Sequence, residues 1–170
     1  MDTALPDIAR KGRGAVSNRT GRFEGYDAVA IDDGWDRPQD EDLPPLRTTV
    51  TADATRTIIA RNTSPDVPFD RSINPYRGCE HGCVYCFARP THAFLGLSPG
   101  LDFESRLFYK PDAAALLENE LRKKSYKCDV MAMGTNTDPY QPIERDFKLT
   151  RRILEVLAAH NHPVGIVTKS

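Results

Sequence analysis

Three cysteines crowd into one short segment of the chain. Cys79, Cys83 and Cys86 form a C-x3-C-x2-C pattern within the string GCEHGCVYCF. In a reducing compartment, such crowding indicates a bound metal or cluster rather than disulfide bonds. Three thiolates on a tight loop can each bind one iron of a cubane 4Fe-4S cluster, which leaves the fourth iron open for another ligand. The pattern therefore predicts a cluster that can bind a small molecule directly.

A single zinc ion also fits this loop. Zinc prefers four tetrahedral sulfur or nitrogen ligands, and His81, His92 or Cys128 could supply the fourth. Structural zinc sites usually pair two short cysteine knuckles, whereas this chain has one. The spacing favours the iron-sulfur cluster, and a zinc-binding interaction module without catalysis stays open as the alternative.

The residues from 66 onward alternate between strand-like and helix-like segments. Strands are expected at 71–76, 128–134 and 163–168, helices at 111–124 and 149–160, and 101–110 also looks extended. Strands that alternate with helices form parallel sheets, and right-handed crossovers place both helices on one face. The loop at 134–144 should then face the cysteine loop at the carboxyl edge of the sheet. Cys128, at the opposite end of its strand, is expected to be a small core residue.

The expected βαβαβ order stops with the third strand, just before Ser170. Three parallel strands with two helices can cover one face of the sheet, whereas parallel sheets normally have both faces covered. We therefore interpret residues 66–170 as the first part of a larger α/β domain, truncated after its third strand. Such a sheet should have an exposed apolar edge and a tendency to self-associate through it.

Residues 1–65 form a polar segment with few periodic apolar positions. A basic, glycine-rich start at 10–14 precedes an acidic stretch at 27–42, which contains Trp35. Up to residue 70 there are 9 basic and 13 acidic residues, and beyond it 14 basic and 11 acidic. We expect this segment to be largely irregular, disordered or loosely attached. The strand-forming residues at 48–60 are expected to add an edge strand or arm to the domain that follows.

Composition excludes some classes of protein. The 170 residues are 39% hydrophobic and 28% charged, and no apolar run reaches the roughly 20 residues that a membrane-spanning helix needs. The first residues lack the features of a signal peptide, so the expected location is cytoplasmic, with no membrane partner. A net charge of −1 predicts neither a nucleic-acid nor a membrane partner.

Longer strings around the cysteines carry a family resemblance. These strings are KGRGAVSN at 11–18, SINPYRGC at 72–79, CFARPTH at 86–92 and GTNTDPYQPIE at 134–144. The cysteine pattern after the first strand of an α/β domain, with an aromatic residue before the third cysteine, resembles the radical S-adenosylmethionine (SAM) superfamily. The strings together resemble an uncharacterised bacterial branch related to spore photoproduct lyase. The resemblance implies that the chain is the first βαβαβ portion of a partial (β/α)6, TIM-like barrel.

The resemblance also implies a chemistry. SAM would bind the open iron, and one electron from the reduced cluster would cleave it to methionine and a 5′-deoxyadenosyl radical. An external one-electron donor such as flavodoxin or ferredoxin is the implied partner. The substrate is unknown, and DNA or a nucleotide is suggested only by the relation to the lyase. The lyase has its hydrogen-donating cysteine at the position of Thr135, so thymine-dimer repair by that route is in doubt.

The resemblance assigns expected roles to individual residues. Cys79, Cys83 and Cys86 would be the iron ligands. The expected SAM-binding residues are Tyr85 beside the cluster, Phe87 with backbone groups for the adenine, Thr137 and Asp138 for the ammonium group, and Lys169 for the carboxylate.

Overall fold

The computed structural model describes residues 7–27, 29, 31 and 45–170. Most of the acidic stretch, including Trp35, lies outside the described residues. The elements in chain order are β1 (Thr49–Ala52), β2 (Ile59–Arg61), β3 (Arg71–Ile73), β4 (Tyr76–Arg77), the 3-10 helix η2 (Arg89–Leu95), α1 (Leu101–Ser105), β5 (Arg106–Tyr109), α2 (Ala113–Leu121), β6 (Met131–Met133), α3 (Glu144–Phe147), α4 (Leu149–Ala159) and β7 (Val164–Ile166).

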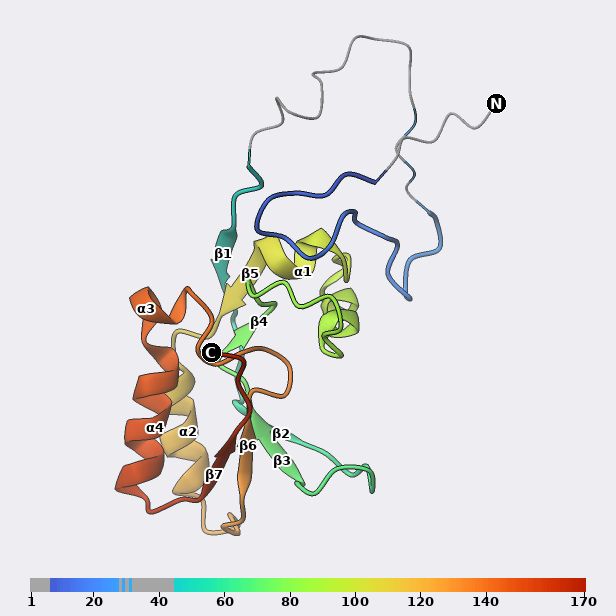
Figure 1. Cartoon of the computed structure of the whole chain (residues 1–170). Coiled ribbons are helices and arrows are strands. Elements are labelled where there is room, and N and C mark those ends of the chain that lie inside the picture. Colours follow the sequence, from blue (N-terminus) through green and yellow to red (C-terminus); the bar gives the residue numbers. More distant parts are fainter. Residues whose placement is uncertain (1–6, 28, 30, 32–44) are drawn as a thin grey trace.

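The larger sheet has the strand order β2-β3-β6-β7. Strands β3, β6 and β7 are parallel to one another, and β2 pairs antiparallel with β3. Helices α2 and α4 follow β5 and α3, and both lie on one side of this sheet (Figure 1). The predicted alternation of parallel strands with helices on one face is therefore confirmed, and the fold class is α/β.

The main hydrophobic core lies between this sheet and the two helices. Ile73, Met131 and Met133 contribute from β3 and β6, and they pack against Leu117 of α2 and Ile153 of α4. All five side chains are fully buried. The odd positions of β3 and β6 therefore face the helices, whereas Ser72 and Ala132, which pair with each other, face the opposite side of the sheet.

A smaller sheet has the order β1-β5-β4, with β1 parallel and β4 antiparallel to β5. The expected strand at 71–76 is instead two strands in different sheets, interrupted at Pro75, which has no backbone N–H to donate to a ladder. Likewise, 101–110 is not wholly extended, because its first half forms α1. Asp102 and Glu104 lie in the first turn of α1, where negative charge favours a helix.

The segment before residue 66 is joined to both sheets. Strand β1 pairs with β5 and β2 pairs with β3, which confirms the edge strands expected at 48–60. Farther upstream, the Leu101 N–H donates to Ser17 O at 3.1 Å, and the Ser98 hydroxyl donates to Arg19 O at 2.6 Å. Residues 11–19 therefore lie against α1, as the blue ribbon shows (Figure 1).

Strand β7 lies at the edge of the larger sheet. It pairs with β6 through Val164, Gly165 and Ile166, and the sheet continues no farther within the described residues. Ile166 of β7 and the following Val167 are exposed. The exposed apolar edge is as expected, and self-association through it stays a prediction. Among the described residues, every helix is too short or too polar to span a lipid bilayer.

Candidate functional site

The cysteine loop begins directly after β4, at Gly78. The φ angles of Gly78 and Gly82 are +78° and +62°, in the left-handed region that favours glycine. A Cβ on Gly78 would lie 2.7 Å from both Leu107 Cδ2 and Phe103 O, so a side chain has no room there. The backbone of Cys79 then donates to Phe103 O at 2.9 Å. The start of the loop is thus fixed against α1 and β5.

The three predicted iron ligands are free thiols on this loop. Cys79 is buried, whereas Cys83 and Cys86 are partly exposed. Burial raises the pKa of the Cys79 thiol to about 11, and the charges of Asp138 and Cys86 add to this shift. The backbone amides of His81 and Asp138 act in the opposite direction and lower the pKa. A bound cation would hold Cys79 as a thiolate in spite of its burial.

The donor set suits a cluster in its chemistry and its backbone setting. Three free thiols lie on one tight loop, in which Gly78 and Gly82 adopt left-handed φ angles. Within the part of the chain that the structure describes, no three His, Cys, Asp or Glu side chains lie close enough together to hold one metal ion. Cysteines that hold a cubane bind three different irons, so a cluster does not require such grouping.

The loop after β6, residues 134–142, lies against the cysteine loop. The Thr137 hydroxyl donates to Gly78 O at 2.7 Å, and the Gln141 amide donates to the same oxygen at 3.3 Å. The Glu80 N–H donates in return to Gln141 Oε1 at 3.1 Å. These contacts confirm the expectation that the two loops face each other at the carboxyl edge of the sheet.

Replacing Thr137 with valine should destabilise the fold. The hydroxyl is buried, donates to Gly78 O and accepts from Gln141 Nε2 at 2.9 Å, and valine removes both interactions. We expect the free energy of unfolding in urea to fall by about 1–3 kcal/mol. The control Thr63→Val alters an exposed threonine and should change it by less than about 0.5 kcal/mol. Equal effects of the two variants would contradict this account of Thr137.

Asp138 joins the loop after β6 to the segment after β7. Its carboxylate accepts from the Thr168 hydroxyl at 2.9 Å and from the backbone N–H groups of Lys169 and Tyr140 at 2.7 and 2.8 Å. His81 of the cysteine loop lies 3.5 Å from the same carboxylate. Asp138 and Lys169, both predicted site residues, are therefore neighbours. The Lys169 ammonium forms no hydrogen bond or ion pair with any described residue.

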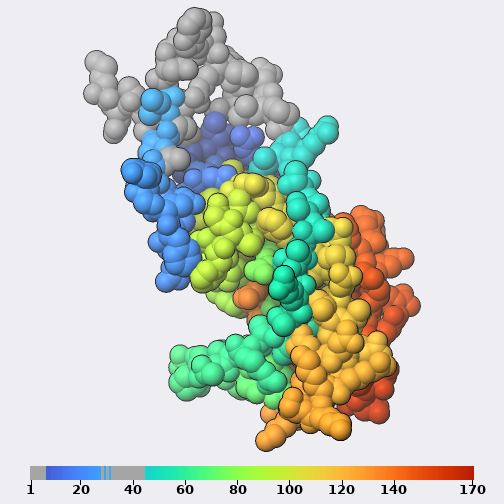
Figure 2. Space-filling model, turned by 180° about the vertical axis from the view of Figure 1, so that it is seen from behind, coloured from blue at the N-terminus to red at the C-terminus, as the bar shows by residue number. Residues whose placement is uncertain are grey.

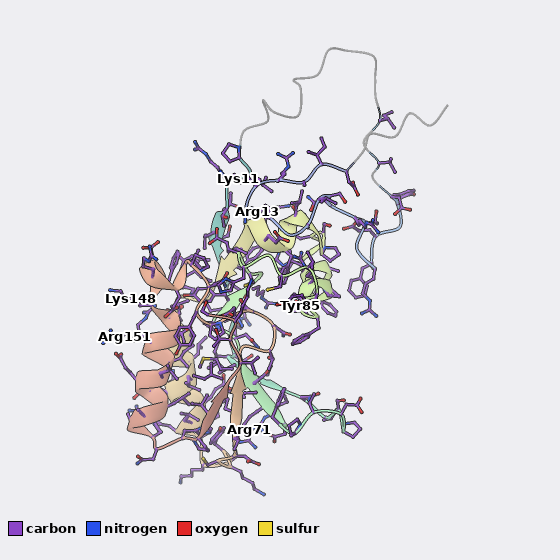
Figure 3. The ribbon with its side chains drawn as sticks, in the orientation of Figure 1. Lys11, Arg13, Arg71, Tyr85, Lys148 and Arg151 are labelled. Atoms are coloured by element: carbon purple, nitrogen blue, oxygen red, sulfur yellow. The ribbon has the colours of Figure 1, made fainter. Side chains whose placement is uncertain are left out.

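The tip of the cysteine loop exposes large apolar side chains. Tyr85 is 79% exposed and Phe87 is 75% exposed, and Val84 beside them is also exposed. Figure 3 shows Tyr85 below α1. The structure therefore places these two predicted cofactor-binding residues on the surface of the site, free of packing against the core.

The side chains considered as a fourth zinc ligand lie in different surroundings. His92 is buried, with Nε2 3.0 Å from Arg106 O and its ring against Phe103. Burial lowers its pKa. Cys128 is exposed, so its expected place in the core is wrong, because β6 begins three residues later at Met131. His81 lies in the loop itself, next to Asp138.

A buried ion pair beneath the cysteine loop was not found from the sequence. Glu104 of α1 has a fully buried side chain that pairs with Arg89. Its carboxylate also accepts from the N–H groups of Gly14 and Ala15, each at 2.9 Å. Arg89 in turn donates to Cys83 O at 3.0 Å. Gly14 and Ala15 belong to the string KGRGAVSN. The sequence does not indicate that this string contacts Glu104, because Gly14 and Glu104 are 90 residues apart.

The glycine-rich start touches the cysteine loop directly. A Cβ on Gly14 would lie 1.8 Å from Gly82 O, so only glycine permits this approach of the two backbones. Arg13 donates to Glu104 O at 2.6 Å and to Thr48 Oγ1 at 2.8 Å, and it lies beside α1 in Figure 3. Residues 13–15 therefore form part of the support of the cysteine loop.

Comparisons with known proteins find relatives of uncharacterized function. The chain is 48% identical over 103 residues to "Uncharacterized protein Rv2578c" of Mycobacterium tuberculosis and to "Uncharacterized protein Mb2609c" of Mycobacterium bovis. These matches cover 61% of this chain and 30% of each relative. "Uncharacterized protein MJ0683" of Methanocaldococcus jannaschii is 34% identical over 99 residues, which cover 58% of this chain and 34% of that protein. No family model and no solved structure matches. The chain spans about a third of the length of the relatives it matches.

Proposed function

We propose that this chain is the N-terminal part of a radical SAM protein that binds a 4Fe-4S cluster through Cys79, Cys83 and Cys86. The observation that carries the proposal is the position of the three free thiols. They lie on one loop at the carboxyl edge of a parallel sheet, where the segments after β6 and β7 also meet. Active sites of α/β barrels lie at this edge. The proposed complete fold is a partial (β/α)6 barrel, of which β3, β6 and β7 are the first parallel strands.

The chain's own residues would bind and insulate the cluster. The three thiolates would hold three irons, and the amides of His81 and Asp138 lie beside the Cys79 sulfur. Amide donors near cluster sulfurs raise the reduction potential, since they stabilise the added negative charge. Bound together, the cluster and SAM supply a one-electron reduction that yields methionine and a 5′-deoxyadenosyl radical.

The predicted SAM-binding residues differ in the contacts that they already make within the chain. The rings of Tyr85 and Phe87 are exposed and available to a ligand at the loop. The Thr137 hydroxyl already donates to Gly78 O, so its role in this state is to position the cysteine loop. Asp138 would accept from the SAM ammonium in place of one of its present donors. The Lys169 ammonium, which has no partner among the described residues, suits a carboxylate.

Other parts of the function stay proposals that rest on the sequence resemblance. The relation to spore photoproduct lyase suggests DNA or a nucleotide as the substrate. An external one-electron donor such as flavodoxin or ferredoxin would reduce the cluster, and the exposed tip of the cysteine loop offers it access. Because the chain spans about a third of its relatives, further residues of a longer protein would complete the substrate site.

Electron paramagnetic resonance tests the proposal. The chain is reconstituted with iron and sulfide without oxygen, reduced with dithionite, and measured with and without SAM. We expect about four irons and four sulfides per chain and a reduced-cluster signal that changes when SAM is added. A signal that does not change when SAM is added would contradict the proposal that one iron is open to SAM.

The same samples distinguish the zinc alternative. One tightly held zinc per chain, with no iron uptake and no visible absorption, would overturn the cluster proposal and favour a zinc-binding module without catalysis. Zinc content is measured before and after reconstitution, so that zinc displaced by iron is recognised.

A further inference from the structure

A cavity of about 320 Å³ opens beside the cysteine loop. Asn74 directly after β3 and Asn136 in the loop after β6 line it, and residues 57–60, which include the start of β2, form another wall. Phe94 of η2 is exposed at its rim. In Figure 2, a few orange atoms are visible between the teal segment that contains β1 and β2 and the green segment after the cysteine loop.

Lys110, which directly follows β5, is a buried cation in the wall of this cavity. The residue is 9% exposed, and its ammonium forms no hydrogen bond or ion pair with any described residue. Burial lowers its pKa to about 8, the charge of Arg77 acts in the same direction, and Asp53 opposes it. Burying an ammonium group without a hydrogen-bond partner costs free energy. The position of Lys110 therefore points to a bound ligand as its partner.

Further donors face the same space. Arg77 donates through Nε to Asp53 at 2.7 Å, and its two Nη atoms make no hydrogen bond within the described parts of the chain. The side-chain amide of Asn136 is likewise unpaired among these residues and is exposed. The positive charges of Lys110 and Arg77 and the negative charge of Asp53 add up to one net positive charge at the cavity. A buried ammonium, a guanidinium edge and an amide together are the donors that bind oxyanions.

We propose that this cavity binds an oxyanion group of a ligand, a phosphate or a carboxylate, with Lys110 as its principal counter-ion. The exposed ring of Phe94 offers a flat apolar surface to the part of the ligand beyond the anion. The inference needs no metal and no SAM. Anion binding and cluster binding can therefore succeed or fail independently.

Sulfate titration of the purified chain, followed by calorimetry at constant ionic strength, is the first test. We expect saturable binding of sulfate. Lys110→Met should weaken it at least about tenfold, because a hydrogen bond to a charged group is lost. The control Lys124→Met removes an exposed lysine and should leave the affinity unchanged. Because Lys110→Met also removes a buried unpaired charge, its melting temperature should not fall, so lost binding cannot be attributed to unfolding.

The pH dependence gives an independent readout. Sulfate stays a dianion from about pH 7 to about pH 9.5. The charged groups that face Lys110 are Arg77 and Asp53. Tyr76 also lines the cavity, and burial raises the pKa of its hydroxyl, so it stays neutral. Burial lowers the pKa of Lys110 to about 8, so sulfate affinity should fall as the pH rises through this value. Lys110→Met should show no such fall.

Phosphate, acetate, adenosine 5′-monophosphate and adenosine then identify the source of the anion. Tighter binding of adenosine 5′-monophosphate than of adenosine or phosphate would indicate a nucleotide whose ring lies on Phe94. Preference for acetate would indicate a carboxylate ligand. The proposal is overturned if no anion binds saturably, or if the wild-type chain and Lys110→Met bind all four alike.

Discussion

Replacing Glu104 with alanine is expected to lower the free energy of unfolding by about 3–5 kcal/mol, because it leaves the buried Arg89 without its counter-ion. The side chains of Arg89 and Glu104 are 12% and 0% exposed. The variant also leaves the N–H groups of Gly14 and Ala15 without their acceptor. Urea denaturation, followed by circular dichroism, measures the change.

A second glutamate-arginine pair in the chain supplies the matched control. Arg122, which directly follows α2, and Glu118 of α2 lie one turn apart on the surface, with side chains that are 67% and 41% exposed. Glu118→Ala should cost less than about 0.5 kcal/mol, since solvent screens an exposed pair. Similar costs for the two glutamates would contradict the structural role assigned to Glu104.

Removing both charges of the buried pair separates two effects: the cost of burying an unpaired charge, and the attraction between Arg89 and Glu104. The double variant Arg89→Met with Glu104→Leu has no unpaired charge, so it should be more stable than Glu104→Ala. Arg89 also donates to Cys83 O, and the double variant loses that bond. We therefore expect it to loosen the cysteine loop even where overall stability recovers. Faster alkylation of Cys83 would report this loosening.

The elements that position the site were predictable where the signal is local. The apolar spacing of Ala113 and Leu117 indicated α2, and alternating strands and helices indicated the parallel order of β3, β6 and β7. Parallel order then placed the loop with Thr137 and Asp138 opposite the cysteines, and the contacts with Gly78 and Glu80 confirm that placement.

The features that the sequence did not reveal depend on contacts between distant segments. Glu104 and Lys110 are ordinary surface residues by type, and nothing next to them in the sequence indicates burial. Glu104 is buried because Gly14 and Ala15 lie over it, 89 to 90 positions away. Lys110 is buried in the cavity to which residues 57–60 contribute. The spacing of apolar residues in strands and helices, with periods of two and 3.6 residues, carries no information on contacts between such distant segments.

The loss of bound iron in single cysteine variants is the other large effect that we expect. Cys79→Ala, Cys83→Ala and Cys86→Ala should each lose the reduced-cluster resonance and retain well under one cluster per chain. Three protein thiolates hold the proposed cubane, and two do not retain it through desalting. Iron and sulfide analysis after anaerobic reconstitution measures the loss. Cys83 and Cys86 are partly exposed, so their variants should keep the fold, which circular dichroism verifies.

The fourth cysteine serves as the control for this series. Cys128 is an exposed free thiol that precedes β6, at the end of the sheet away from the cysteine loop. Cys128→Ala should keep the full cluster content and an unchanged resonance, because no proposed iron ligand lies near it. A loss of iron in Cys128→Ala equal to that in Cys86→Ala would mean that iron binds to thiols without selection. Retention of the cluster by all three loop variants would place the iron elsewhere in the chain and remove the basis for a radical SAM site at Cys79, Cys83 and Cys86.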